Sequence, residues 1–502
     1  MAETKLEDIV SLSKRRGFIY QGSDVYGGLS GTWDYGPLGV ALKRNIMNLW
    51  WRMFVEDRDD MYGVDAAILM NQKVWQASGH VETFIDPLVE CSECKGRFRE
   101  DHLIRDARNK LDSYDKSMQE KVESYRKNSS YVNFYDEIKE KEPEVFKKIM
   151  EVETGPSNFD LDEAEDFGLE NWSHVKTAIH CPSCGKQGTF GAARAFNMMF
   201  KTNVGPVEDE SSISYLRPET AQGIFTNYRN VVDSFYPDLP FGIAQQGKAF
   251  RNEISPRDFV FRSREFEQME IEYFVHPDKW EEAFEAWRVQ VHEWFKALGL
   301  DESKTHELDV PAEDLAHYSK RTIDFEFDFP HGRDELLGMA YRTDFDLGNI
   351  QRTSGKSMEY TVKGTNKKFV PHVIEPSFGV ERALMAVLCS AYREDEQNGE
   401  KRIYLALPEH LAPVKYCVSP LLKNKPELVA KAREVYDALK KKHGAVMWDD
   451  NGNIGKRYRR QDEIGTPHCV VIDFQTLEDG TVTVRDRDTT QQRRVQLDEI
   501  VQ

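Results

Sequence analysis

The residues best suited to chemistry lie between Phe241 and Phe274, where two runs of alternating polar and apolar residues flank a polar turn segment. That pattern predicts one long antiparallel hairpin, and because strand side chains alternate between faces, one face collects the polar groups. An arginine beside residues as small as glycine and alanine holds an anion while leaving room for a flat ligand. The alternative, from these residues alone, is an ordinary hairpin with one solvated face. We expect the working face to carry Gln245, Gly247, Ala249, Arg251, Glu253, Phe266, Gln268, Glu270 and Glu272, and the core face to carry Phe250, Met269, Ile271 and Tyr273.

Two further segments combine charged residues with a helix start. The proline of R-P-E-T-A-Q-G predicts a helix start that places Glu219 in the first turn, where the helix dipole stabilises a carboxylate. The second segment is E-P-S-F-G-V-E-R at 375–382. An extended chain there would put Glu375, Ser377 and Gly379 on one face. The helix that opens at Gly379 would then hold Arg382 near its N-terminus, where a fixed cation suits a polyphosphate. For Glu219 the alternative is a capping acid without a binding role. For the second segment the alternative is a strand-helix junction with a surface arginine.

Four of the seven cysteines form two C-x-x-C pairs, Cys91 with Cys94 and Cys181 with Cys184. Two such turns present four thiolates to one point and close a tetrahedral zinc site, whereas vestigial or redox thiols are the alternative. The odd total and the paired spacing fit a reducing compartment rather than a disulfide framework. The long charged segment between the pairs is expected to form a mostly helical insertion.

The composition describes a soluble globular protein with two or three domains. The chain has 502 residues, of which 40% are apolar and 30% charged. No apolar run reaches membrane-crossing length and the N-terminus lacks a hydrophobic signal block, so we expect no membrane partner and a cytoplasmic location. The net charge of −19 argues against a nucleic-acid partner, but residues 421–460 carry eleven Lys and Arg against five Asp and Glu. That stretch is either a phosphate-binding surface or a solvated helix face.

The elements that must position these groups are helices and strands in alternation. Apolar residues at helical spacing predict helices over residues 5–16, 40–55 and 278–298. Strands are expected on both sides of a turn at 330–332. The sequence contains neither a dinucleotide-binding fingerprint nor a P-loop, so a nucleotide would have to bind in another way.

The predicted fold class is α+β, with an antiparallel sheet flanked by helices. We expect this domain to cover residues 1–400, with a helical and zinc-binding insertion at about 90–190. A polar segment at 392–401 predicts a boundary. The last part, 401–502, alternates strands and helices and predicts an α/β domain.

Three motifs resemble those of one enzyme class. F-R-N-E at 250–253 followed by F-R-S-R-E-F at 261–266 resembles motif 2 of the class II aminoacyl-tRNA synthetases, and E-P-S-F-G-V-E-R at 375–382 resembles their motif 3. The segments F-E-Q-M-E-I-E and R-P-E-T-A-Q-G resemble the corresponding segments of the glycyl-tRNA synthetases of the homodimeric type. The resemblance covers nearly the whole chain. One departure is Gln72, which stands where motif 1 of the family usually has proline before K-V-W.

The resemblance implies a glycine–tRNA ligase that makes glycyl-adenylate from glycine and ATP with Mg²⁺, then transfers glycine to the 3′ end of tRNA(Gly). It also implies a homodimer whose interface uses the helix over 40–55, and a C-terminal anticodon-binding domain. The alternatives are a non-catalytic nucleic-acid-binding relative and a synthetase for another amino acid. The motif arginines argue against the first, and R-P-E-T-A-Q-G argues against the second. The basic residues implied to contact the tRNA backbone are Lys456, Arg457, Arg459 and Arg460.

The resemblance also implies roles for individual residues, with Arg251, Glu253 and Arg382 as the catalytic set. The residues implied to bind ATP are Arg251, Asn252, Glu253, Phe261, Arg262, Ser263, Arg264, Glu265, Phe266, Glu335, Leu336, Gly379, Val380, Glu381 and Arg382. Those implied to bind glycine are Arg99, Glu219, Phe266, Glu267, Gln268, Met269, Glu270, Glu375, Pro376, Ser377, Phe378 and Gly379. The structural zinc would be held by Cys91, Cys94, Cys181 and Cys184.

Overall fold

The computed structural model describes residues 5–104, 106, 176, 179–207, 209–397 and 399–501. The chain divides into two compact units, Met1–Val81 with Met199–Gln502, and Glu82–Met198. The predicted helical insertion lies almost wholly outside the described residues. None of the helices in the described segments combines the length and the apolar character needed to span a membrane.

The larger unit is built on a seven-stranded sheet in the order β11-β12-β13-β16-β10-β9-β3. Neighbouring strands run antiparallel, except that β3 and β9 are parallel. The predicted hairpin is confirmed as the adjacent pair β9 and β10, and the turn at 330–332 joins β12 to β13. The strands are β3 (Met61–Gly63), β9 (Phe241–Phe250), β10 (Glu265–Val275), β11 (Thr305–Asp309), β12 (Arg321–Phe329), β13 (Gly332–Thr343) and β16 (His372–Gly379).

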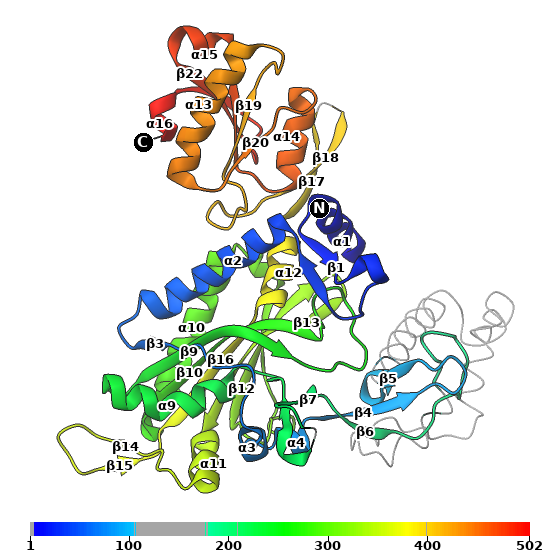
Figure 1. Cartoon of the computed structure of the whole chain (residues 1–502), viewed down its shortest axis with the longest axis vertical. Coiled ribbons are helices and arrows are strands. Elements are labelled where there is room, and N and C mark those ends of the chain that lie inside the picture. The colour runs from blue at the N-terminus through cyan, green and yellow to red at the C-terminus, as the bar shows by residue number, and fades with distance from the viewer. Residues whose placement is uncertain are drawn as a thin grey trace, which may run out of the picture. The chain divides into compact units, whose positions relative to one another are not determined.

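Helices cover both faces of this sheet (Figure 1). One face packs Met269, Ile271 and Tyr273 of β10 into the largest apolar core, as the alternation predicted. The other face packs Ile243 and Phe274 against α9 in a smaller core. The covering helices are α2 (Pro37–Trp51), which continues as a π-helix (Arg52–Glu56), α10 (Trp280–Leu298) and α12 (Val380–Ala391) on the first face, and α9 (Ala221–Phe235) and α11 (Phe345–Ser354) on the second.

The predicted helices over 5–16, 40–55 and 278–298 are confirmed within a few residues. The first is α1 (Leu6–Arg16), and Gly17, with a φ of 77°, ends it in the left-handed conformation that favours glycine. Phe250 was predicted for the core, but it lies at the end of β9 and is only half-buried.

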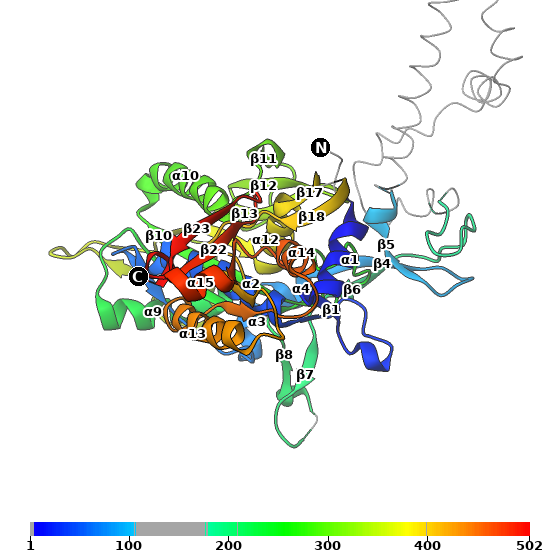
Figure 2. The ribbon, with the colours of Figure 1, turned by 90° about the horizontal axis from the view of Figure 1, so that it is seen from above.

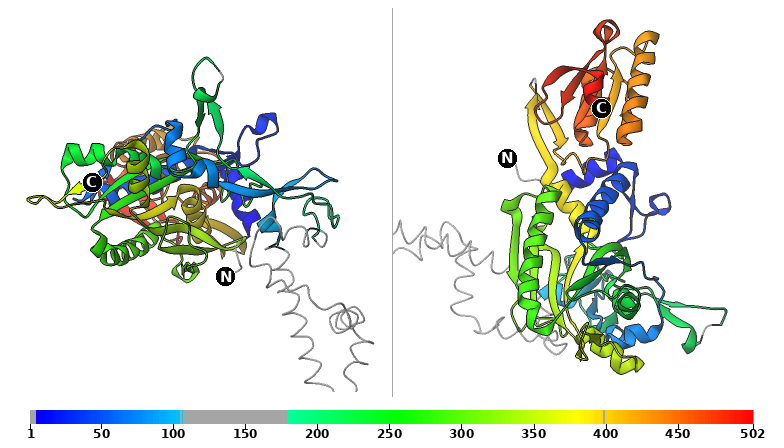
Figure 3. Two further views of the ribbon diagram at one scale, coloured as in Figure 1. Left: turned by 90° about the horizontal axis from the view of Figure 1, so that it is seen from below. Right: turned by 90° about the vertical axis from the view of Figure 1, so that its left-hand side faces the viewer.

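Smaller elements connect these layers. A hairpin of β7 and β8 projects from the larger unit, as two perpendicular views show (Figures 2 and 3). The smaller elements are β1 (Ile19–Gln21), a 3₁₀ turn (Asp24–Tyr26), β2 (Trp33–Tyr35), α3 (Gln72–Ala77), α4 (His80–Thr83), β7 (Lys201–Asn203), a 3₁₀ turn (Glu210–Ser212), β8 (Ile213–Tyr215), 3₁₀ turns (Pro277–Lys279 and Glu302–Lys304), β14 (Tyr360–Thr361) and β15 (Lys368–Phe369).

The C-terminal part forms a five-stranded sheet in the order β20-β19-β21-β22-β23. Helix α13 packs along this sheet (Figure 3) through Ala432, Val435 and Leu439. The segment at which a boundary was predicted, 392–401, forms most of an antiparallel hairpin, β17 (Tyr392–Gln397) with β18 (Glu400–Leu405). The other elements are β19 (Tyr416–Pro420), α13 (Pro426–His443), β20 (Val446–Trp448), α14 (Ile454–Glu463), β21 (His468–Ile472), α15 (Phe474–Asp479), β22 (Thr481–Asp486), β23 (Gln492–Gln496) and α16 (Leu497–Val501).

The second unit contains a three-stranded antiparallel sheet in the order β5-β4-β6. Its strands are β4 (Ile85–Glu90), β5 (Arg97–Arg99) and β6 (Arg194–Asn197). A small core of its own packs Val89, Leu103 and Phe190 around Cys91 and Cys181.

Candidate active site

The polar face of the central strands forms a continuous row across the sheet. Glu270 of β10 pairs with Gln245 of β9 on one side and with Ser377 of β16 on the other. Ser377 pairs in turn with Gly338 of β13. Because cross-strand partners share a face, the predicted grouping of these side chains is confirmed.

The Glu270 carboxylate accepts hydrogen bonds on both of its oxygens. Ser377 Oγ donates to Oε1 at 2.8 Å, and the Thr220 hydroxyl donates to Oε2. Gln268 Nε2 lies 3.5 Å from Oε1. Burial, and then the charge of Glu219, raises the pKa of Glu270, while the hydroxyl donors lower it. The carboxylate is therefore held in one orientation by hydroxyl groups of β16 and of the residue before α9.

A buried arginine links the neighbouring acids. Arg342 Nη1 donates to both oxygens of Glu375, at 3.0 and 2.8 Å, and the other guanidinium nitrogens donate to Asp346 at 2.8 and 3.0 Å. All three side chains are buried. Burial alone would lower the pKa of Arg342, but Asp346 and Glu375 raise it well above its ordinary value.

Glu219 lies just before α9 rather than in its first turn. The helix begins at Ala221, so the predicted helix start is two or three residues too early. His80 Nε2 lies 3.3 Å from Glu219 Oε2. Burial alone would raise the pKa of Glu219, but His80, Arg342 and Arg251 lower it to about 2. This carboxylate is therefore ionised at neutral pH.

Arg251 lies in the loop that follows β9, because that strand ends at Phe250. Its Nε donates to the Pro218 carbonyl at 3.1 Å, and its guanidinium lies over the Phe266 ring, 5.3 Å from the centroid. Its charge helps to lower the pKa of both Glu219 and Glu335. Arg251 therefore stands between two ends of the polar face. One is the acidic end with Glu219, Glu270 and Glu375, and the second lies around Glu335.

That second end carries the motif 3 arginine. Helix α12 begins at Val380 after Gly379, as predicted, so Arg382 lies in its first turn. Arg382 Nη1 donates to the Glu335 carbonyl at 2.9 Å and lies 3.0 Å from the Glu335 carboxylate. Its guanidinium lies over the Phe261 ring, 4.5 Å from the centroid. Burial would raise the pKa of Glu335, but Arg382 outweighs it and lowers the pKa.

Several residues assigned to the site by resemblance have side chains elsewhere. Glu267 forms an ion pair with Lys43 of α2, and Glu381 accepts from the main-chain N–H of Glu267 at 2.8 Å and from Tyr35 at 3.3 Å. These acids therefore lie on the opposite, helix-covered side of the strands. The main chain of these segments still borders the polar face. The assigned residues with side chains in or toward the large core are Met269, Leu336, Phe378 and Val380, and Pro376 alternates to that side with Phe378.

The remaining assigned residues belong to the loop between β9 and β10 and its base. Arg264 donates to the carbonyls of Glu253 and Ser30, at 2.9 and 2.7 Å. Arg262 lies 3.9 Å from the Glu253 carboxylate, and Ser263 donates to the Val260 carbonyl at 3.1 Å. These contacts fold the loop on itself. At its base, Asn252 is half-buried, and Glu265, the first residue of β10, pairs with Lys248 at 2.9 Å.

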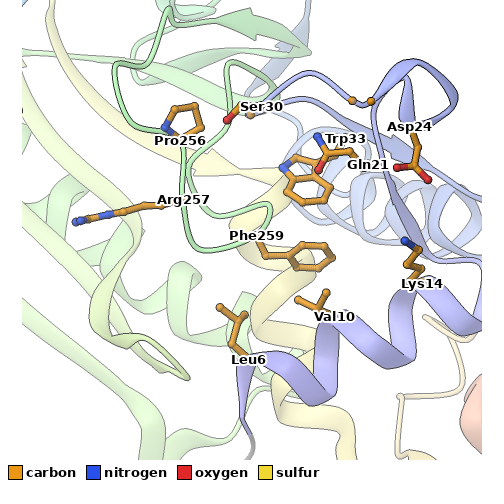
Figure 4. Close-up of a pocket in the computed structure, with 13 residues that line it drawn as sticks. Leu6, Val10, Lys14, Gln21, Asp24, Ser30, Trp33, Pro256, Arg257 and Phe259 are labelled. Carbon is orange, nitrogen blue, oxygen red and sulfur yellow. The ribbon is translucent and has the colours of Figure 1, made fainter. Parts of the chain in front are cut away.

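The outer side of the same loop lines a cavity of about 660 Å³ (Figure 4). Phe259 of the loop contacts Trp33 of β2 edge to face, with ring centroids 4.8 Å apart. Pro256 and Arg257 lie at the rim, opposite Lys14 of α1. The N-terminal elements therefore anchor the loop whose two ends carry Arg251 and Arg264.

The space above Gly247 is not free for a ligand, contrary to the sequence-based expectation. A Cβ built on Gly247 would lie 2.2 Å from Arg217 Nη2. Arg217 is buried and donates to the carbonyls of Lys248 at 2.6 Å and Ala66 at 2.7 Å. The glycine therefore makes room for an arginine of the same protein, which fixes the R-P-E-T-A-Q-G segment on β9.

The four predicted zinc ligands converge in the second unit. Their four sulfur atoms, those of Cys91, Cys94, Cys181 and Cys184, all lie within 4.8 Å of one another. The Cys91 and Cys184 sulfurs are 3.9 Å apart, and those of Cys94 and Cys181 are 3.6 Å apart. Four thiols at this spacing suit a tetrahedral ion.

Arg99, which the resemblance assigned to glycine, also lies in the second unit. It contacts Asp86 at 2.7 Å and Asp101 at 2.6 Å. The fold of that unit thus places this guanidinium between two carboxylates.

One basic residue assigned to tRNA is instead part of the C-terminal core. Arg457 is 2% exposed and donates to the carbonyls of Pro420, Asp450 and Gly452. Four hydrogen bonds to main-chain oxygens leave it a structural role, so its assignment to the tRNA backbone is corrected. Lys456 remains exposed on α14.

Sequence reasoning gave no role to Arg342, His80 or Thr220. The signal that could have revealed Arg342 is a charged residue on the same strand face as Gly338 and Ala340, where a buried cation requires acid partners. His80 and Thr220 meet their partners only through the fold, and no spacing in the sequence indicates those contacts.

Two family descriptions match the chain. Residues 200–391 match "tRNA synthetase class II core domain (G, H, P, S and T)", and residues 415–502 match "Anticodon binding domain". In fold, the chain is similar to a prolyl-tRNA synthetase of Giardia lamblia solved with prolyl-adenylate, with a TM-score of 0.61. That likeness covers 99% of this chain and 76% of the other at 14% identity, so it shows the fold alone.

Full-length relatives define the family more closely. The chain is 44% identical over 505 residues to a glycine–tRNA ligase of Thermobifida fusca, covering 99% of this chain and 96% of the relative. It is 45% identical over 499 residues to the glycine–tRNA ligase of Clostridium acetobutylicum, with coverage of 99% and 97%. It is also 45% identical over 531 residues to the one of Thermus thermophilus, with coverage of 100% and 98%.

The antiparallel sheet, with Arg251 after one strand and Arg382 opening a helix at its polar face, is that of a class II aminoacyl-tRNA synthetase. Class II synthetases use ATP with Mg²⁺. The identity over nearly the full length places the chain in the glycine–tRNA ligase family.

Proposed function

We propose that the protein activates glycine with ATP and transfers it to tRNA(Gly). The observation that carries this proposal is the polar face itself, on which a cluster of acids that includes the ionised Glu219 adjoins two arginines, Arg251 and Arg382. A cationic ammonium group suits the acidic end, and the anionic phosphates of ATP suit the arginines. The glycine carboxylate would then lie near Arg251, between the two ends.

At the acidic end, Glu219, Glu270 and Glu375 would surround the ammonium group of glycine. Glu219 supplies a full negative charge, since its pKa is about 2. Ser377, which donates to Glu270 at 2.8 Å, would stand beside the α-carbon. A close-packed wall rejects larger side chains by overlap, which is how a pocket prefers the smallest amino acid.

At the other end, Arg251 would hold the α-phosphate and Arg382 the γ-phosphate, and Phe266 would stack on the adenine. Magnesium, when bound, neutralises phosphate charge. The attacking carboxylate is already a nucleophile at neutral pH, so the first step needs no general base. Catalysis is then positioning and charge stabilisation by fixed groups.

Glycine-dependent ATP–pyrophosphate exchange tests the proposal, with alanine, serine, threonine and proline assayed beside glycine. We expect exchange with glycine alone. Absence of exchange with every amino acid, from folded protein supplied with magnesium, would contradict it. That result would instead favour a non-catalytic nucleic-acid-binding relative.

We further propose a domain arrangement for tRNA binding, with catalysis in 1–400 and anticodon binding in 401–502. The match of residues 415–502 to an anticodon-binding domain supports this division. The test is charging of tRNA(Gly) by a variant in which Lys456 is replaced by Gln. Aminoacylation should weaken, most at lower salt, because the variant makes one phosphate contact fewer and depends less steeply on salt, while exchange of pyrophosphate is unchanged.

A homodimer in the cytoplasm and a structural zinc complete the proposal. The zinc would be held by the four cysteines, whose sulfurs lie within 4.8 Å of one another. Elemental analysis should find one zinc per chain, and Cys94→Ser with Cys184→Ser should remove it. Light scattering should give twice the chain mass of 58.1 kDa. A monomer would contradict the dimer without bearing on the zinc.

A further inference from the structure

Glu272 is a buried acid to which the activity described above gives no role. It follows Glu270 by two residues on β10, and its side chain is 0% exposed. Among the residues that the structure describes, neither of its carboxyl oxygens has a hydrogen-bond partner. One oxygen from each of Glu270, Glu272 and Glu375 lies within 4.8 Å of the others, so Glu272 points into the acid cluster.

The surroundings of Glu272 do not support a charge. Its cross-strand partner on β9 is Ile243, which belongs to the apolar core under α9 together with Phe274. An ionised carboxylate without donors in such a place is strongly unfavourable, whereas a protonated one has a hydroxyl to donate. The neighbouring acceptors are carboxylates, since oxygens of Glu270 and Glu375 lie within 4.8 Å of a Glu272 oxygen.

We propose that Glu272 is a positioning residue that keeps its proton and donates a hydrogen bond to Glu375, holding that carboxylate toward the ammonium group of glycine. The proposal rests on the proposed function, because it assigns the ammonium group to this cluster. It adds a neutral fourth member whose role is to orient a charged one.

The charged groups around the cluster support this placing of the proton. Burial and Glu375 raise the pKa of Glu272 well above its ordinary value, and Glu270 and Asp346 add to the rise. Burial also raises the pKa of Glu375, but its contacts with Arg342 limit the rise to about 8. Arg342 therefore favours the ionised form of Glu375 through direct hydrogen bonds. Arg342 already donates to Asp346 and Glu375, and Glu272 receives none of its hydrogen bonds.

Two substitutions separate a neutral donor from a charged group. Glu272→Gln keeps the shape and an N–H donor, and Glu272→Leu removes the donor. We expect the KM for glycine to stay within about threefold in E272Q and to rise about tenfold in E272L, the effect of one lost hydrogen bond. The KM for ATP should not change in either variant. A merely structural defect would change the KM for ATP as well.

The pH dependence of kcat/KM for glycine gives a second readout that does not depend on E272L folding. The profile of E272Q between pH 6 and 9 should superimpose on that of the unchanged protein. A glycine KM in E272Q as high as in E272L, or a missing ionisation in its profile, would overturn the neutral role. Unchanged glycine KM in both variants would overturn the positioning role. Failure of the proposed function is distinguishable, because the unchanged protein would then show no glycine-dependent exchange.

Discussion

Two clusters of arginine and carboxylate in the described part of the chain, each centred on buried side chains, differ in their balance of charge. In the C-terminal domain, Asp462 accepts from Arg485 at 2.7 and 3.0 Å and from Arg402 at 3.4 Å. Arg402 also donates to Asp395 at 2.8 and 2.5 Å. Two arginines thus pair with two carboxylates, so the positive and negative charges of this cluster balance.

The cluster on the polar face has one arginine for several acids. Arg342 is shared between Asp346 and Glu375, and Glu219, Glu270 and Glu272 lie beyond its hydrogen bonds. Burial, and then repulsion between the acids, raises the pKa of Glu270 and Glu375, as expected for a site short of positive charge. By our proposal, the first cluster holds the fold together, whereas the second is completed by the ammonium group of glycine.

The largest effect is expected from breaking the balanced cluster. Asp462→Asn leaves two buried guanidinium groups without their shared partner, which costs about 3–5 kcal/mol of stability. Denaturant unfolding should show a weakened C-terminal domain, while the KM for glycine in pyrophosphate exchange stays the same. An equal loss of glycine affinity would remove the distinction between the two clusters.

Neutralising one acid of the unbalanced cluster should, unlike Asp462→Asn, weaken the use of glycine. Glu219→Gln removes an ionised group, so kcat/KM for glycine should fall about 100-fold, or about 2.7 kcal/mol. Because His80, Arg342 and Arg251 lower the pKa of Glu219 to about 2, its charge also stabilises the fold, and the free energy of unfolding should fall as well. Exchange kinetics beside thermal unfolding measure both quantities, and a loss of stability without a loss of activity would count against the assignment.

The unbalanced cluster should also couple glycine binding to pH. Glu375 has a pKa of about 8 in the folded protein, above its ordinary value, so the folded state retains a proton that the unfolded state loses. Its contribution to stability is complete below the ordinary pKa and declines as pH rises toward 8. Ammonium binding favours the ionised carboxyl, so glycine affinity should rise by up to about tenfold per pH unit across that window. Thermal shifts with and without glycine from pH 6 to 8.5 test this, and a constant shift would contradict it.

The smallest effect is expected at the wall of the pocket. Ser377→Gly removes a hydroxymethyl group and one donor to Glu270. The preference for glycine over alanine in pyrophosphate exchange should fall by less than about tenfold, since small apolar differences discriminate weakly. Unchanged selectivity would show that another residue excludes the methyl group.

The strand alternation in the sequence predicted most of the sheet. Met269 and Ile271 point to the core and Glu270 to the polar face, because period-two patterning leaves only one register with apolar residues inside. The start of α12 after Gly379 was also predicted. These features depend on local sequence.

What the sequence did not reveal depends on contacts between distant segments. His80 meets Glu219 across 139 positions of the chain, and Arg342 meets Glu375 across a strand pairing. The burial of Arg457 depends on loops that close over it. No propensity or spacing encodes such partners, so they follow only from the fold.

Gly247 and Arg217 each restrict which residue the other position can accept. A methyl group at 247 would displace the guanidinium that lies 2.2 Å from its position, and a shorter side chain at 217 would leave the glycine covering an empty space. Drift at either position is therefore constrained by the other, and lineages that changed one would be expected to have changed both. A residue without a side chain thus constrains which neighbours its descendants can have.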